Sequence, residues 1–110
     1  MDMVSIKRFD LFWVELRPTI GSEISKIRPC VIISPDVSNK HLNTIIIAPL
    51  TSTIRKYPTR IICKIKNKTG EIALDQIRTV DKSRLTKKIG EIDTKTAKAI
   101  CDLLITFFEY

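Results

Sequence analysis

The chain has 110 residues, of which 44% are hydrophobic and 28% charged, and its mean hydropathy is +0.03. This length suits one domain with one core, so we expect residues 1–110 to fold as a single unit, and the composition excludes a disordered chain. The apolar runs are far shorter than the roughly 18 residues of a membrane-spanning helix, and the charged N-terminus lacks the apolar stretch of a signal peptide. We therefore expect a cytoplasmic protein.

The net charge of +7 is concentrated in the middle of the sequence. Residues 51–90 contain eleven basic and three acidic side chains, a net charge of +8, whereas the rest of the chain sums to −1. Such a local excess is typical of a surface that binds phosphates or an acidic polypeptide. A lysine-rich face that only keeps the protein in solution gives the same pattern, so charge alone leaves both interpretations open.

The first half of the chain predicts three strands. An aromatic and β-branched run at 12–16 is typical of a strand, and a long turn-rich segment follows it at 17–29. Continuous apolar runs at 30–33 and 44–48 are too short for helices and stop near prolines. We interpret both runs as strands that are buried on both faces.

The second half predicts a hairpin, then a short strand. Strands at 60–66 and 71–77 flank typical turn residues at 67–70. The pattern at 81–85 fits one helical turn, and 88–92 fits a last strand.

The final predicted element is a helix that begins at Asp93 or Thr94, because either side chain can cap it. Apolar residues then recur every three or four positions on one helical face: Ala97, Ile100, Cys101, Leu104 and Phe108. Five or more short strands and one terminal helix predict a mainly β fold, a small antiparallel barrel with the helix over an opening.

The three cysteines, Cys30, Cys63 and Cys101, lie far apart and form no C-x-x-C pair. The single histidine, His41, lies in a polar segment at 38–43 that we interpret as a loop with a solvated side chain. Zinc-site spacing is absent, so we expect three reduced core cysteines and no metal. The sequence also lacks a Gly-rich phosphate loop, G-x-S-x-G and H-E-x-x-H, and we expect no cofactor.

The segment at 17–29 is the first candidate for chemistry, because long connections without structure of their own are often functional. Arg28 precedes Pro29, and a proline keeps the residue before it extended. The Arg28 guanidinium suits bidentate binding of a phosphate. An ion pair between Arg28 and Glu23 is an equally good interpretation of the spacing.

Two further segments carry polar side chains at strand ends. Thr51 follows Pro49 closely and can donate to a phosphate oxygen beside Arg28 if the two strand ends are neighbours, although a hydroxyl there more often caps a turn. The segment at 75–85 interleaves two acidic with three basic residues. This segment suits either a salt-bridged turn or the floor of a groove.

Three motifs occur in order: F-W-V-E-L-R-P-T-I-G-S-E-I-S-K-I-R-P-C-V-I-I-S-P-D, then I-I-I-A-P-L-T-S, then L-D-Q-I-R-T-V-D-K-S-R-L with I-G-E-I. Together they resemble the MazF/PemK toxins of bacterial toxin–antitoxin systems, from Phe9 to the end of the chain. The resemblance implies an SH3-like barrel with a C-terminal helix. It also implies a homodimer that cleaves single-stranded RNA, commonly mRNA, at short motifs without a metal, and a cognate antitoxin whose tail blocks the RNA groove.

The catalytic arginine and threonine of that family fall on Arg28 and Thr51. The resemblance implies that a ribose 2′-hydroxyl attacks the adjacent phosphorus, that these two side chains stabilise the phosphorane, and that Glu23 or Asp75 accepts the proton. Six further residues are expected to bind RNA: Lys26, Ser52, Arg55, Lys56, Gln76 and Arg78.

Ala73 and Ser22 stand where some members of the family have an arginine and a histidine, which indicates a different subclass of nuclease. Two other functions fit parts of the pattern. One is a toxin of related fold that binds a protein target such as DNA gyrase, and the other is an SH3-like module that binds nucleic acid without cleaving it. We expect the endoribonuclease, because the R-P and P-L-T-S motifs occur together beside a strongly basic segment.

Overall fold

The computed structural model describes residues 5–110. Nine helices and strands follow in chain order in this part of the chain: β1 (Asp10–Glu15), β2 (Ile27–Ile32), α1 (Asp36–His41), β3 (Thr44–Thr51), β4 (Arg60–Ile65), β5 (Lys68–Ala73), β6 (Arg78–Asp81), β7 (Leu85–Glu91) and α2 (Thr94–Phe108). Two short 3-10 turns, η1 (Leu74–Gln76) and η2 (Lys82–Arg84), flank β6. Within the described residues no helix is long and apolar enough to cross a membrane.

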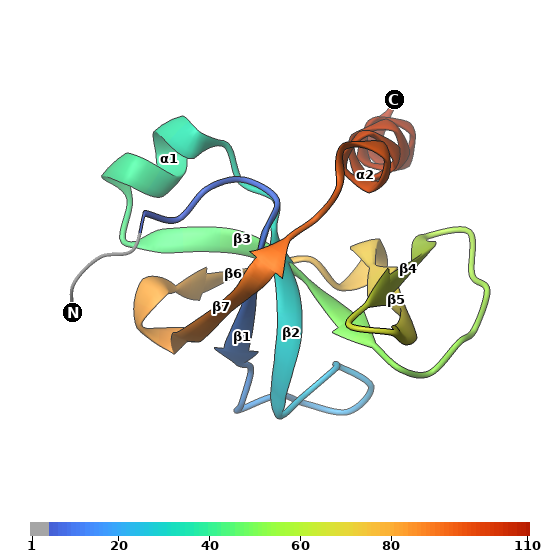
Figure 1. The fold of residues 1–110 in the computed structure, drawn as a ribbon, viewed down its shortest axis with the longest axis horizontal. Coiled ribbons are helices and arrows are strands. Elements are labelled where there is room, and N and C mark those ends of the chain that lie inside the picture. The colour runs from blue at the N-terminus through green and yellow to red at the C-terminus, as the bar shows by residue number, and fades with distance from the viewer. Residues whose placement is uncertain (1–4) are drawn as a thin grey trace.

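The strands form one strongly curled antiparallel sheet (Figure 1). Their order is β4-β5-β3-β2-β1-β7, and β6 pairs with the first half of β3. The sheet is a half-barrel whose strand order begins with β4 and ends with β7, and α2 packs against β4. The predicted mainly β fold, an SH3-like antiparallel barrel with a C-terminal helix, is confirmed.

Alternation along the central strands builds two apolar clusters. In β2, Cys30 and Ile32 belong to a cluster with residues of β1, β6 and β7, whereas Val31 belongs to a cluster with residues of β5 and α2. In β3, Ile47 belongs to the first of these clusters and Ala48 to the second. Both strands are therefore buried on both faces, as their continuous apolar runs predict.

The predicted cap of α2 is confirmed. Asp93 Oδ1 accepts a hydrogen bond from the Thr96 amide at 2.9 Å. On the predicted apolar face Ala97 and Ile100 are buried and the next two members are half-buried. Phe108, the last residue of α2, is 66% exposed.

Two predicted loops are shorter than expected. β2 begins at Ile27, so Arg28 lies inside the strand and not in the preceding segment. The interpretation of 38–43 as a loop was wrong, because most of this segment belongs to α1. Pro35 has φ −65° and an extended ψ directly before this helix, which suits the residue that begins it.

The predicted hairpin exists with a different turn. Lys66 and Asn67 connect β4 to β5, with φ values of 49° and 66°. Two left-handed residues are the geometry of a tight turn between twisted strands, so the turn begins one residue before the expected 67–70 segment and is shorter. The strand expected at 71–77 ends at Ala73, where η1 turns the chain toward β6.

All three cysteines are free. Cys30 is buried, as predicted, and burial raises the pKa of its thiol to about 12. The prediction of core positions was wrong for Cys63 and Cys101, which are only half-buried; Cys63 packs against the margin of the cluster around α2. Burial raises the pKa of Cys63 to about 11.

Candidate active site

Two adjacent strand ends carry the residues expected to act on phosphate. β2 and β3 pair antiparallel with Cys30 opposite Pro49, and the same register continued by two residues puts Arg28 opposite Thr51. Arg28 and Thr51 line one hollow of about 280 Å³, which we call the Arg28 groove. The two strand ends are therefore neighbours, which is the condition for both side chains to contact one phosphate.

The other walls of the Arg28 groove carry aromatic and cationic side chains that sequence reasoning missed. Trp13 of β1 is 39% exposed and lines the groove, as do Lys66 and Lys68 from the β4–β5 hairpin. Trp13 alternates with the buried Phe12 and Val14, and this alternation was the available signal for an outward aromatic ring. The two lysines gave no such signal, because only the fold brings the hairpin to β2.

β5 fixes the position of Thr51. Thr51 is paired with Glu71, and a Cβ atom placed on the preceding Gly70 would lie 2.8 Å from the Thr51 carbonyl oxygen. A glycine is therefore required where the two backbones approach. Thr51 Oγ1 accepts a hydrogen bond from the Thr53 amide at 3.2 Å, so the hydroxyl caps the turn and still has a proton to donate.

A backbone carbonyl of the preceding segment holds the Arg28 side chain, and the Glu23 carboxylate does not. Its Nε donates to the Ser25 carbonyl at 3.1 Å. Glu23 Oε1 instead accepts a hydrogen bond from the Ile20 amide at 2.6 Å, and within residues 5–110 no ion pair joins Arg28 to Glu23. The planar guanidinium is thus oriented by one backbone contact.

The two candidate proton acceptors line a different hollow. Glu23 and Asp75 border a space of about 460 Å³ and are not among the lining residues of the Arg28 groove. Pro49 lines this second hollow, whereas the next residue of β3, Leu50, lines the Arg28 groove. The structure thus places the four expected catalytic residues as two pairs in separate hollows, Arg28 with Thr51 and Glu23 with Asp75.

Gln76 and Arg78 hold the segment that connects β1 to β2. Gln76 Oε1 accepts a hydrogen bond from the Ile24 amide at 2.6 Å, and its Nε2 donates to the Ser22 carbonyl at 3.4 Å. Arg78 Nη1 donates to the Leu16 carbonyl at 3.1 Å. Both side chains also line the second hollow. In the structure, Gln76 and Arg78 therefore order the segment between β1 and β2 beside the candidate site.

Asp75 is held firmly by Arg60. Arg60 Nε lies 2.7 Å from Asp75 Oδ1 and Nη2 lies 3.2 Å from Oδ2, and Thr59 Oγ1 donates to Oδ1 at 3.0 Å. Burial acts to raise the pKa of Asp75, but these hydrogen bonds and the Arg60 charge outweigh it and lower that pKa below its ordinary 3.8. A carboxylate stabilised in this way is a weak base.

The remaining expected RNA-binding residues lie at different places. Ser52 lines the Arg28 groove beside Thr51. Lys26, Arg55 and Lys56 are exposed and line neither hollow. Among residues 5–110, no group of three or more His, Cys, Asp or Glu side chains is placed to hold a metal.

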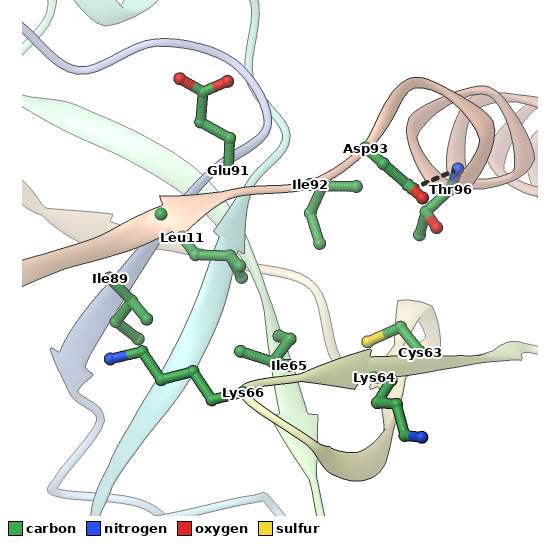
Figure 2. Close-up of a pocket in the computed structure, with 11 residues that line it drawn as sticks. Leu11, Cys63, Lys64, Ile65, Lys66, Ile89, Glu91, Ile92, Asp93 and Thr96 are labelled. Atoms are coloured by element: carbon green, nitrogen blue, oxygen red, sulfur yellow. Dashed lines mark hydrogen bonds between the residues drawn. The ribbon is translucent and has the colours of Figure 1, made fainter.

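A third hollow, of about 380 Å³, lies between β4 and β7 near the start of α2 (Figure 2). In Figure 2, Leu11, Ile65 and Ile89 point into it, and Lys66 extends along its rim. Ile65, Lys66 and Ile89 also line the Arg28 groove, so the two hollows are continuous at the hairpin tip. This opening of the half-barrel contains none of the expected site residues.

The family model for the PemK-like, MazF-like toxins of type II toxin–antitoxin systems matches residues 7–108. The chain belongs to this family. It is 35% identical over 105 residues to "Endoribonuclease EndoA" of Bacillus subtilis, an alignment that covers 90% of each protein. It is also 41% identical over 101 residues to "Endoribonuclease MazF" of Staphylococcus saprophyticus, with 86% of this chain and 84% of that protein covered.

Solved structures have the same fold. The crystal structure of MazF from Deinococcus radiodurans superposes with a TM-score of 0.86 at 21% identity, and covers 98% of this chain and 100% of that one. An endoribonuclease in complex with its cognate antitoxin, from a mycobacterial species, superposes with a TM-score of 0.78 at 25% identity, and covers 92% of each chain.

Proposed function

We propose that this chain is the toxin of a type II toxin–antitoxin pair, an endoribonuclease that cleaves single-stranded RNA, commonly mRNA, at a short sequence motif without a metal. Membership of the PemK/MazF toxin family and two relatives named endoribonucleases support the activity. The observation that carries the chemistry is that Arg28 and Thr51 line one groove. A guanidinium and a hydroxyl in one concave site suit a phosphodiester.

In the proposed reaction a ribose 2′-hydroxyl attacks the adjacent phosphorus as the bond to the 5′ oxygen breaks. The products are a 2′,3′-cyclic phosphate and a 5′-hydroxyl end. Arg28 neutralises charge that develops on the phosphorane, and Thr51 donates a hydrogen bond to a non-bridging oxygen. Donors fixed in advance act strongly here, because their reorientation costs nothing as the charge forms.

Glu23 is the proposed acceptor of the 2′-hydroxyl proton. Both oxygens of Asp75 are bound by Arg60, and its lowered pKa makes Asp75 a weak base. Glu23 uses Oε1 for the Ile20 amide and lies in the exposed 17–26 segment, beside the second hollow. The proposal requires the scissile phosphodiester to lie between the two hollows, with Glu23 on the side of the 2′-hydroxyl.

The substrate is bound, in this proposal, by a cationic surface around both hollows. Ser52 and Arg28 contact the scissile phosphate region, and Gln76 and Arg78 order the segment beside it. Three exposed cations extend the surface along the RNA: Lys26, Arg55 and Lys56. The net charge of +8 over 51–90 supports a polyanionic ligand.

A cognate antitoxin and a second copy of the chain are the proposed protein partners. The antitoxin complex among the related structures supports the first. The exposed end of α2 supports the second, because Ile105, Phe107 and Phe108 are 67%, 45% and 66% exposed, which is unusual for a monomer of this size. We further propose that residues 1–110 act as one toxin domain in the cytoplasm, where mRNA is present.

The test is incubation of purified protein with a defined mRNA in EDTA, followed by mapping of the 5′ ends. Discrete fragments with a shared sequence at the cut are the expected result. Binding of the RNA without fragments would indicate a non-catalytic module. Inhibition of DNA gyrase in a supercoiling assay, with the RNA left intact, would instead indicate a toxin with a protein target.

A further inference from the structure

The best-buried carboxylate of the described residues is neither a proposed catalytic residue nor a proposed RNA-binding residue. Glu71 is 0% exposed, and it lies on β5 directly opposite Thr51. Burying a carboxylate costs free energy unless hydrogen-bond donors compensate for the lost water. The donors that bind Glu71 therefore indicate what it stabilises.

The partners of Glu71 lie in the segment 52–59, which joins β3 to β4 without helix or strand, and at the start of β4. Glu71 Oε2 accepts hydrogen bonds from the Arg55 amide at 3.1 Å and the Lys56 amide at 2.8 Å. Oε1 lies 3.3 Å from Arg60 Nη1, at the first residue of β4. The Glu71 side chain thus ties the middle of the segment to the start of β4, and the Glu71 backbone is paired with the end of β3.

The backbone of this segment needs such support. Lys56 has φ 58°, in the left-handed region that a residue with a Cβ atom rarely adopts. Its amide hydrogen bond to a charged acceptor favours that conformation. Burial acts to raise the pKa of Glu71, but the two amides and Arg60 outweigh it and lower that pKa. The carboxylate is therefore charged when it holds the segment.

The segment is also close to the Arg28 groove. Ser52 lines that groove, and Arg55 follows it by three residues, so the Arg55 backbone lies within roughly 11 Å of the Ser52 backbone even if fully extended. Figure 1 shows the segment running along the outer side of the β4–β5 hairpin. Arg55 and Lys56 are exposed there. Two cations are thus presented beside the groove on a fixed backbone.

We propose that Glu71 is a positioning residue for substrate binding: it preorders the 52–59 segment, so that Arg55 and Lys56 meet the RNA backbone without a cost of ordering. This inference rests on the proposed function for the identity of the ligand. Fixing a binding segment in advance improves affinity chiefly by removing the entropy lost on binding. This role belongs to substrate binding and not to the chemical step. Loss of Glu71 should therefore raise KM and leave kcat nearly unchanged.

The experiment compares Glu71→Leu and Glu71→Gln with the wild type, in the full chain. The leucine variant keeps an apolar side chain of similar size and removes the acceptor, whereas the glutamine variant keeps one carbonyl oxygen and loses the charge. The matched control is Asp10→Asn, because Asp10 is the other buried carboxylate of the described residues, 2% exposed, and binds the Lys7 amide at 2.9 Å and Lys88 Nζ at 3.3 Å. Its partners lie outside the 52–59 segment.

Two readouts separate positioning from general stability. Without RNA, hydrogen exchange at the Arg55 and Lys56 amides and trypsin cleavage after these residues should be faster in Glu71→Leu, intermediate in Glu71→Gln and unchanged in Asp10→Asn. With an RNA oligonucleotide, KM should rise roughly tenfold for Glu71→Leu with kcat within about twofold, because two preordered cations are lost. Asp10→Asn should leave KM unchanged.

Equal exchange at these amides in the wild type and Glu71→Leu would overturn the inference, and so would an unchanged KM despite faster exchange. If Glu71→Leu does not fold, Glu71→Gln decides by the same two readouts. A wild-type protein that leaves all RNA intact would overturn the proposed function itself. The amide exchange, measured without RNA, would still show whether Glu71 holds the segment.

Discussion

Gly70 lies so close to Thr51 that a Cβ atom on it would come within 2.8 Å of the Thr51 carbonyl oxygen. Backbone cannot move aside as a flexible side chain does, so Gly70→Ala should shift Thr51 in the Arg28 groove. A displacement of about 1 Å can cost up to about 100-fold in rate, and we expect a loss of cleavage between about tenfold and that limit. The measurement is kcat/KM on a short RNA.

Gly90 is the matched control for this change. An added Cβ there meets nothing within 4 Å, so Gly90→Ala should cleave RNA like the wild type. If Gly70→Ala and Gly90→Ala were equally active, the close approach of β5 would not control the position of Thr51.

Thr51→Val should lower kcat by a factor of about 100, because a hydrogen-bond donor to the phosphorane is replaced by a methyl group of the same shape. Thr51→Ser keeps the donor and should retain most activity. The two variants also differ in the cap on the Thr53 amide, so their thermal unfolding must be compared with their kinetics. Equal kcat values for the valine and serine variants would rule out a donor role.

The choice between the two carboxylates can be tested by substitution. Glu23→Gln should lower kcat, since the proton acceptor is removed. Asp75→Asn should lower kcat less, because both Asp75 oxygens are bound by Arg60, which helps to lower the pKa of that carboxyl. A larger loss of kcat in Asp75→Asn than in Glu23→Gln would reverse the assignment.

Acid should destabilise the protein through Glu71 and Asp75. The pKa values of both carboxyls are lower in the folded chain than their ordinary values of 4.5 and 3.8, so the unfolded chain binds more protons as the pH falls. Their stabilising contribution is present above these ordinary values and is lost as the pH falls through the folded ones. Chemical denaturation at pH 7, 5, 4 and 3 should show this loss, with a flatter profile for Glu71→Gln.

Salt should weaken binding of single-stranded RNA in proportion to the phosphates that are neutralised. Each phosphate contact contributes about −0.7 to the slope of log K against log salt concentration. The double variant Arg55→Gln, Lys56→Gln should reduce the magnitude of the slope by about 1.4. Filter binding with an inactive Arg28→Ala background allows the measurement without cleavage, and an unchanged slope would place both cations outside the RNA path.

The sequence predicts the parts of this molecule that depend on local patterns. Unbroken apolar runs identify β2 and β3 as strands buried on both faces, and Asp93 identifies the start of α2. The hairpin turn at Lys66 and Asn67 begins one residue before the predicted 67–70 segment, because left-handed residues without glycine carry a weak signal. α1 was missed because a six-residue helix shows too little periodicity.

The candidate site was predictable as a list of residues but not as an arrangement. The motifs identify Arg28 and Thr51, yet only the β2–β3 register shows that they are neighbours. Asp75 is bound by Arg60, fifteen residues away in sequence, and no local pattern shows this contact. The role of Glu71 was not predictable, because nothing in the local pattern of this basic segment shows that its one glutamate is buried.

The central claim is that Arg28 and Thr51 act together on one phosphodiester. The most direct measurement is cleavage of a single-stranded mRNA in EDTA by the wild type, Arg28→Ala and Arg28→Lys, with the fragment ends mapped. We predict discrete fragments with 5′-hydroxyl ends for the wild type and a rate lower by about 100-fold or more for Arg28→Ala, with partial recovery in Arg28→Lys. Fragments formed by Arg28→Ala at the wild-type rate would contradict the account.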